Sequence, residues 1–393
     1  MLKSNSFARG VHNSLKIIDR TFRSFLFPLL LFSVAACQQA NSNTPSSGIS
    51  VKRSQTQLML NNAILEQSNP EDNIVWKIQA KTSLYTEDKQ IARLQTVTAN
   101  LLQDDKIILR VSADTGEIRD NGNLILLKDN IVAQDTRNGI IVKSDEIEWR
   151  PTENLLAIRK NPLGIHPNLE IKATEGIYHT DTQSFELQRN IVATTIDPAL
   201  QLTSERLVWQ IPQQTLESPL ALQIIRYQQD ETVTDRLVAD RGKVNLETNM
   251  ATLNNNIELV SLDPQLQMAT DSLIWNYKTR IVNADKPIQI IAREHNIDVT
   301  GNQAQVDLNK NIARLNDGVK GINRQDNTQI YARELVWNID NKVIEARGNV
   351  AYQQSEPKIN LTGEKAVAKL AQERIVVTGN KQKQVISTII NEQ

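Results

Sequence analysis

The sequence contains one cysteine, Cys37, among 393 residues. A chain with a single thiol forms no internal disulfide, so backbone pairing and apolar burial must stabilise its fold. Aromatic residues make up only 4% of the chain, a small supply for a thick globular core but adequate for a thin seam between two sheets. Lys and Arg number 44 against 45 for Asp and Glu. Without a basic excess, we expect no nucleic-acid partner.

Signatures of catalysis are also missing. The sequence has no Walker loop, dinucleotide glycine fingerprint, GxSxG elbow or HExxH helix. The histidines outside the basic leader are not paired at metal-ligand spacing, so we expect no metal and no cofactor. Carboxylate pairs such as Asp145 with Glu146, or Glu175 with Asp181, could serve acid–base chemistry on a solenoid face. Solvation explains why these carboxylates lie at turns or at outward-facing positions, so we do not expect the protein to be an enzyme.

No apolar run is long enough to predict a bilayer-spanning helix. The run Phe25–Ala36 has twelve residues, fewer than the ~20 that a spanning helix needs. It follows a basic leader and ends in Val34-Ala35-Ala36-Cys37, a layout typical of a secretory signal. This ending resembles a bacterial lipobox, which implies acylation of Cys37 at a mature amino terminus. An uncleaved membrane anchor, or a signal cut elsewhere, is the alternative.

The rest of the chain divides by composition. We expect a signal peptide or membrane anchor over residues 1–36, then a lipidated cysteine and flexible tether over 37–50. The tether is small and polar and could reach at most roughly 43 Å. We expect one extended β body over residues 51–380, followed by a tail over 381–393.

A repeat of about thirty-one residues runs through the predicted body. In each unit a small residue stands five positions before a ring or an apolar residue. The small residues are Ala80, Ala113, Ser144, Ala173, Ser204, Ala239, Thr270, Gly301, Ala332 and Gly363. The residues five positions later are Tyr85, Ile118, Trp149, Tyr178, Trp209, Val244, Trp275, Val306, Trp337 and Ala368. Such a period indicates one supersecondary unit stacked on copies of itself.

Period-two alternation and frequent turn signals predict strands throughout this region. We therefore predict an all-β fold, an elongated body of two facing antiparallel sheets with about ten repeats. The first strand, near Gln57–Leu65, and the last, near Arg374–Thr378, would leave unpaired edges that invite pairing with another chain.

The ring ladder has two interpretations. It could pack the seam between the sheets, as such ladders do in most repeat proteins. It could also line a groove for an acyl chain if the sheets part. The predicted groove residues are Tyr85, Ile147, Trp149, Leu207, Trp209, Leu273, Trp275, Leu335 and Trp337. Residues two apart on a strand share a face, so each Leu or Ile points inward beside its tryptophan.

The export signal and the repeats, such as Ser144–Trp149, Thr270–Trp275 and Ala332–Trp337 with Gly348-Asn349-Val350, resemble the OstA-like β-jellyroll. A membrane-attached amino terminus before this fold is similar to the LptC family. The resemblance covers about residues 51–380. The chain departs from the usual LptC in two ways: its ten units imply a lengthened or doubled jellyroll, and Cys37 in a lipobox-like context takes the place of a transmembrane helix.

The resemblance implies a periplasmic, membrane-anchored component of the lipopolysaccharide export bridge. Lipopolysaccharide would arrive from an inner-membrane ABC transporter docked at the amino-terminal edge. It would leave to an LptA-like bridge protein paired with the carboxy-terminal edge. A polysaccharide-binding or polysaccharide-cleaving solenoid and a structural envelope lipoprotein are the alternatives.

Overall fold

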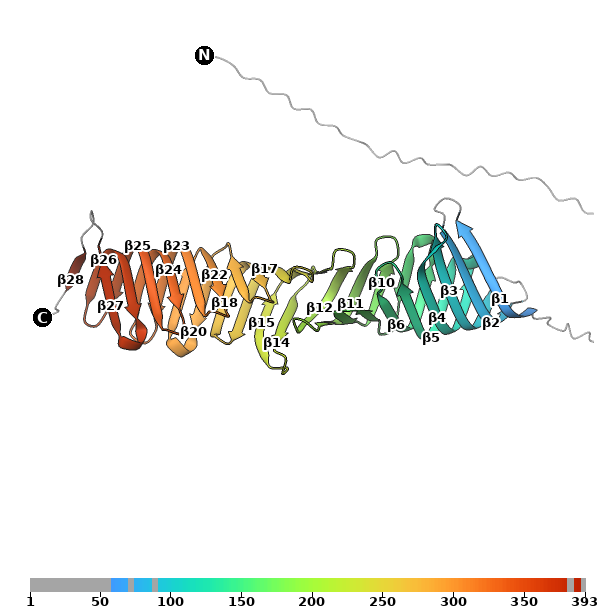
Figure 1. The fold of residues 1–393 in the computed structure, drawn as a ribbon, viewed down its shortest axis with the longest axis horizontal. Coiled ribbons are helices and arrows are strands. Elements are labelled where there is room, and N and C mark those ends of the chain that lie inside the picture. The colour runs from blue at the N-terminus through green and yellow to red at the C-terminus, as the bar shows by residue number, and fades with distance from the viewer. Residues whose placement is uncertain (1–57, 70–73, 87–90, 380–384, 390–393) are drawn as a thin grey trace, which may run out of the picture. The chain divides into compact units, whose positions relative to one another are not determined.

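The computed structural model describes residues 58–69, 74–86, 91–379 and 385–389. The chain divides into two units, Met1–Ser54 and Gln55–Gln393, and all described residues belong to the second. The predicted leader, Cys37 and the tether lie outside the described residues. In the second unit the strands follow one another in chain order from β1 to β28 (Figure 1).

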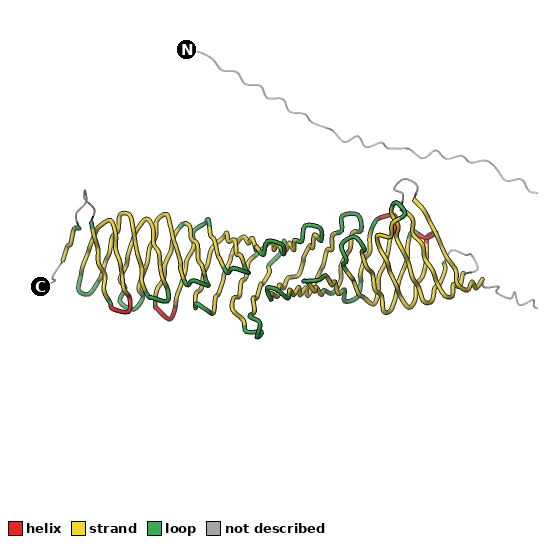
Figure 2. The backbone as a smooth tube through the Cα atoms, in the orientation of Figure 1, coloured by secondary structure: helices red, strands yellow, loops and turns green. Residues whose placement is uncertain are grey.

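The described chain is almost entirely strand, with short loops at the strand ends (Figure 2). The first fourteen strands are β1 (Leu58–Asn69), β2 (Ile74–Tyr85), β3 (Ala92–Gln103), β4 (Lys106–Arg119), β5 (Leu124–Asp135), β6 (Ile141–Arg150), β7 (Leu155–Ile158), β8 (Leu163–His166), β9 (Leu169–Lys172), β10 (Glu175–His179), β11 (Ser184–Thr195), β12 (Leu200–Gln210), β13 (Thr215–Ser218) and β14 (Leu222–Tyr227). The others are β15 (Val233–Ala239), β16 (Arg241–Asn245), β17 (Met250–Leu262), β18 (Gln265–Asn276), β19 (Ile281–Ala284), β20 (Ile288–Ala292), β21 (Ile297–Gly301), β22 (Gln303–Asp307), β23 (Ile312–Asn323), β24 (Thr328–Asn338), β25 (Val343–Gln354), β26 (Ile359–Lys369), β27 (Arg374–Thr378) and β28 (Ile386–Ile389). Single 3₁₀ turns occur at η1 (Asp120–Gly122), η2 (Pro151–Glu153), η3 (Arg293–His295) and η4 (Leu370–Gln372). Among the described residues, no helix has the length and apolar character to cross a membrane.

All 28 strands belong to one antiparallel sheet that folds over on itself. Strand β17 illustrates the fold: Met250–Asn254 pairs with β16, whereas Glu258–Ser261 pairs with β15. The two halves of one long strand therefore belong to two layers. The predicted facing antiparallel sheets are confirmed, and the structure adds that the long strands continue from one into the other.

The fold-over occurs at β-bulges. Register shifts interrupt the pairing of β5, β11, β17, β23 and β25 with their neighbours. At each shift two successive residues have positive φ, for example Asn255 (64°) with Asn256 (47°), and Gly348 (78°) with Asn349 (50°). Asn and Gly adopt this left-handed conformation most readily, and a bulge bends its strand. An Asn followed by an apolar residue recurs in the sequence, as in Asn256-Ile257 and Asn349-Val350. This Asn-apolar motif marks the line along which the sheet turns.

We name the parts of this folded sheet as follows. The ring layer contains the strand halves that carry the tryptophan ladder, and the facing layer contains the other halves. The corner is the bulge line that joins the layers. The mouth is the opposite edge, where hairpin turns of both layers end.

The sequence repeat corresponds to one ladder of directly paired residues in the ring layer. Every ring position of the repeat occupies a rung, and the strands between contribute the alternate rungs. From β1 to β27 the rungs are Leu58, Tyr85, Ala92, Ile118, Ile125, Trp149, Leu156, Tyr178, Phe185, Trp209, Leu216, Val244, Ala251, Trp275, Val282, Val306, Ala313, Trp337, Ile344, Ala368 and Ile375.

The carboxy-terminal end differs from the prediction. Strand β28 lies within residues 381–393, where the sequence predicted only a tail, and it pairs with the facing-layer half of β26. Strand β27 pairs with the ring-layer half of the same strand. The carboxy-terminal edge is therefore divided between β27 and β28, instead of consisting of Arg374–Thr378 alone. A four-residue strand beside a polar run gives too short an alternation to detect.

Candidate functional site

The predicted groove residues all point into the seam between the two layers. Trp149, Trp275 and Trp337 are 0% exposed and Trp209 is 1% exposed. Their Ile and Leu partners two positions earlier are buried to the same degree. Tyr85, near the amino-terminal end, is only partly buried and packs against the edge of the core. The structure thus brings the nine residues to one interior surface, and their contact with lipid stays a prediction.

Contacts across the seam show that the two layers pack directly on each other. The His166 ring in the facing layer meets the Trp209 ring edge-on, with centroids 5.9 Å apart. A Cβ added at Gly164 of the facing layer would lie 3.3 Å from Phe185 and 3.5 Å from Trp209. The interior is therefore filled by side chains, as in a closed core.

Side chains in the seam grow in size from the corner to the mouth. Each ring-bearing strand has a small residue at the corner, then Ile or Leu, then Trp beside the mouth. The sets are Ser144, Ile147 and Trp149; Ser204, Leu207 and Trp209; Thr270, Leu273 and Trp275; and Ala332, Leu335 and Trp337. All of them are buried, so the ring layer fills more of the close-packed interior beside the mouth than at the corner.

The seam loses its cover at both ends of the described body. Apolar residues that are only partly buried against the core gather at the two ends, including Leu65 and Ile74 at one and Ile375 and Val377 at the other. Among the described residues, strand β1 pairs only with β2, and it carries exposed apolar side chains. These are Leu58, Met59, Leu60 and Ile64, exposed by 42%, 60%, 37% and 61%.

One buried polar cluster bridges the mouth near β10. We call it the Asp135 clasp, made of Asp135, Arg137 and Tyr178. Asp135 in the facing layer accepts hydrogen bonds from Arg137 Nε at 3.0 Å and from Tyr178 Oη in the ring layer at 2.6 Å. Arg137 also donates to the carbonyl oxygen of Thr180 in the ring layer. Burial, together with the charge of Asp135, raises the pKa of the Tyr178 phenol.

A second cluster, the Asp235 clasp, consists of Asp235, Arg280 and Arg226. Asp235 in the facing layer accepts two hydrogen bonds from Arg280 of the ring layer, from Nη2 at 2.8 Å and from Nε at 3.0 Å. Arg226 donates from Nε to the Tyr277 carbonyl oxygen at 2.8 Å across the mouth. Burial lowers the pKa of Arg226, and the Arg280 charge adds to this effect. The clasp therefore holds two guanidinium groups around one fully buried carboxylate.

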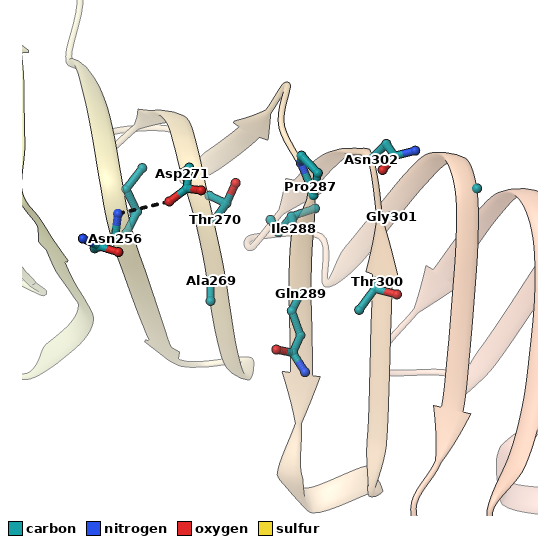
Figure 3. A pocket seen from close by; sticks show the side chains of 12 residues that line it. Asn256, Ala269, Thr270, Asp271, Pro287, Ile288, Gln289, Thr300, Gly301 and Asn302 are labelled. Carbon is teal, nitrogen blue, oxygen red and sulfur yellow. Dashed lines mark hydrogen bonds between the residues drawn. The ribbon is translucent and has the colours of Figure 1, made fainter.

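Shallow hollows lie on the outside of the corner. One, of about 550 Å³, is lined by Thr270, Gly301 and the Asn256 bulge, among others. The backbone N–H of Asn256 donates to Asp271 on the next strand (Figure 3). The side chain of Asn256 donates to Asp240. The small repeat residues thus lie where the strands bend, and polar side chains cover that line.

One carboxylate of each pair considered for acid–base catalysis has an ion-pair partner. Glu146 pairs with Lys160 at 3.0 Å and Glu175 with Arg189 at 3.1 Å. Within the described ranges, no group of three or more His, Cys, Asp or Glu side chains is placed to hold a metal ion.

Comparison with known proteins gives the family. A model of lipopolysaccharide-assembly proteins related to LptC matches residues 28–157 and 221–324, which together exceed half of the chain. The chain belongs to the LptC-related family. The family is one of transport proteins and not of enzymes, in agreement with the prediction, and membership implies a role in lipopolysaccharide transport. Residues 158–220, outside the match, contain β8–β13 and continue the same ladder through Tyr178, Phe185, Trp209 and Leu216.

Among solved structures, the chain is similar to LptH, described as the LptA homologous periplasmic component of the conserved lipopolysaccharide transport device from Pseudomonas aeruginosa. The identity is 14% and the TM-score 0.26, with 31% of this chain and 87% of that chain covered. Comparison with curated proteins gives no match.

Proposed function

We propose that this LptC-related chain is a membrane-attached periplasmic component of the lipopolysaccharide export bridge. It receives lipopolysaccharide from an inner-membrane ABC transporter at the β1 end. It passes the acyl chains along the seam to the next β-jellyroll protein at the β27 and β28 end. One observation carries this proposal: the apolar ladder is continuous from Leu58 to Ile375, and among the described residues the strand at each end has one edge without a partner strand.

The edges suit partners that add a strand. β1 pairs with β2 along one edge and, within the described ranges, leaves its other edge unpaired. β27 and β28 each leave one short edge in their own layer. Backbone hydrogen bonds to a partner strand would continue the ladder from one protein into the next. Acyl chains would then stay in an apolar environment during the transfer, while the sugars and phosphates remain in water.

Lipid can enter the filled seam only if the layers part. The two clasps bridge the mouth, so passage of a chain past them requires their cross-layer bonds to open. The ends, where inward-facing side chains are half-exposed, would be occupied first.

Photo-crosslinking in cells tests the proposal. A photoreactive residue at Leu273 or Trp275 should give lipopolysaccharide adducts, and one at Ile274 should not. Ile274 lies between them on the same strand but faces outward, with 40% of it exposed. Adducts at Ile274 alone, or at none of the three positions, would refute lipid passage through the seam.

A polysaccharide-binding role is the second candidate, and one observation favours it. A cavity of about 1110 Å³ lies between two facing-layer turns, where apolar residues such as Ile196 and Leu200 line it together with the polar side chains of Gln201, Tyr227, Gln228 and Asp230. Such a lining suits sugar hydroxyls. Glycan binding that Tyr227→Ala abolishes, with lipid crosslinking absent, would favour this candidate over the bridge.

A further inference from the structure

Three tryptophans of the ladder bury a hydrogen-bond donor that has no acceptor. The indole Nε1 atoms of Trp149, Trp275 and Trp337 are enclosed, and no described group accepts their N–H. Trp209, the remaining tryptophan of the ladder, does not have a buried donor without an acceptor. A buried donor without an acceptor destabilises a fold, and native structures contain few of them. Repetition of one such feature at three equivalent rungs needs an explanation.

The three rings occupy equivalent places. Between Trp275 and Trp337 the ring layer runs through β18, β19, β22, β23 and β24. Four strand spacings separate the two rings by roughly 19 Å. Trp149 in β6 occupies an equivalent position at another rung of the same ladder. Each ring therefore repeats the same donor along the path proposed for the lipid.

Each ring is also the inward-facing strand residue nearest the mouth. Strand β18 ends one residue after Trp275, at Asn276, while Leu273 and Thr270 follow toward the corner. The five residues from the ring to the corner span roughly 16 Å. An acyl chain that enters through the mouth with its tail toward the corner therefore places its carbonyl end beside the indole.

We propose that the indole N–H groups of Trp149, Trp275 and Trp337 donate hydrogen bonds to the carbonyl oxygens of ester- or amide-linked acyl chains. This inference rests on the proposed function and names the chemistry that the seam selects. An alkyl chain without a carbonyl fills the seam but leaves the donor unpaired. An acylated amphiphile satisfies it and is bound more tightly.

Two lipids that differ only in this group provide the test. They are dodecanoyl lysophosphatidylcholine, whose chain is attached through an ester, and its dodecyl ether analogue. We expect the full-length chain, held in amphipol, to bind the ester about fivefold more tightly in calorimetry, the effect of one hydrogen bond. The triple variant Trp149→Phe, Trp275→Phe and Trp337→Phe removes the donors and keeps a ring, and it should bind both lipids equally. Trp76→Phe changes a buried tryptophan that is not among the predicted groove residues; it is the matched control and should keep the preference.

A measurement without substitutions covers the case in which the triple variant does not fold. The chain has five tryptophans, so indole ¹⁵N–¹H spectra contain few signals. The ester should move the signals of the three rings downfield, and the ether should not.

Equal affinity of the wild-type chain for ester and ether would overturn the inference and leave lipid binding intact, with buried water as the acceptor. A preference that survives the triple substitution would overturn it as well. Failure of both lipids to bind would instead refute the proposed function.

Discussion

Neutralising Asp235 should strongly destabilise the middle of the body. Its carboxylate is 0% exposed, and the side chains of Arg280 and Arg226 are 9% and 16% exposed. The change Asp235→Asn keeps the shape but leaves two buried guanidinium groups without a counter-charge. Removing one partner of a buried ion pair costs about 3–5 kcal/mol. Because the two arginines also repel each other, we expect the effect at the upper part of this range.

Hydrogen exchange is the suitable assay, because repeat arrays unfold in segments and a single melting temperature averages over them. The expected loss corresponds to exchange that is faster by roughly three to three and a half powers of ten. The acceleration should be confined to β14, β15, β17 and β19, which surround the clasp. Strands near either end of the body should exchange as in the wild-type chain.

Two variants separate the charge effect from other causes. Glu345→Gln breaks an exposed pair with Arg347, whose side chain is 60% exposed, and should cost less than about 1 kcal/mol. Replacing the whole clasp by apolar residues, as Arg226→Met, Asp235→Leu and Arg280→Met, leaves no buried charge unpaired. This triple change should alter the free energy of unfolding little. If Asp235→Asn destabilises the fold no more than Glu345→Gln does, the loss of the buried counter-charge does not have the predicted effect.

Two further predictions concern packing and pH. Gly176→Ala should cost about 1–3 kcal/mol, because its Cβ would lie 2.7 Å from Phe185; Gly139→Ala, with open space but φ of +77°, should cost about 1 kcal/mol in chemical denaturation. Burial raises the pKa of Tyr277 and, with the Asp135 charge, that of Tyr178. Stability from both phenols is therefore complete below pH ~10 and is lost as pH rises toward the raised pKa values. In an alkaline absorbance titration these two of the six tyrosines should ionise only on unfolding, and earlier ionisation would show that they are not buried.

The repeat in the sequence predicts much of the fold because it records local geometry. Each unit places a small residue at the bend and a ring or another apolar residue near the mouth. Strand pairing repeats this arrangement at every second rung. The turn from one layer to the other was also visible, as the Asn-apolar motif, but its meaning was not. Only the backbone shows that residues such as Asn256 have positive φ and divide one strand between two layers.

The clasps lay beyond sequence reasoning for a different reason. Asp235 and Arg280 are 45 residues apart, and neither belongs to the thirty-one-residue pattern. A period detects what all units share, whereas each clasp occurs where one unit departs from the others. An Asp or Arg at an otherwise apolar inward position near a turn is the one signal that could have indicated them.

The closed seam is compatible with transport because of the way the fold is assembled. In the absence of lipid, the apolar layers pack against each other because this removes their surfaces from water. An interior filled by side chains is therefore expected for the lipid-free protein. Each strand contacts mainly its neighbours, and opening a few rungs exposes only the side chains of those rungs. An entering acyl chain covers the same apolar surface that the opening exposes. Under the proposed function, lipid would therefore replace the packing between layers unit by unit while the bulges of the corner hold the two layers together.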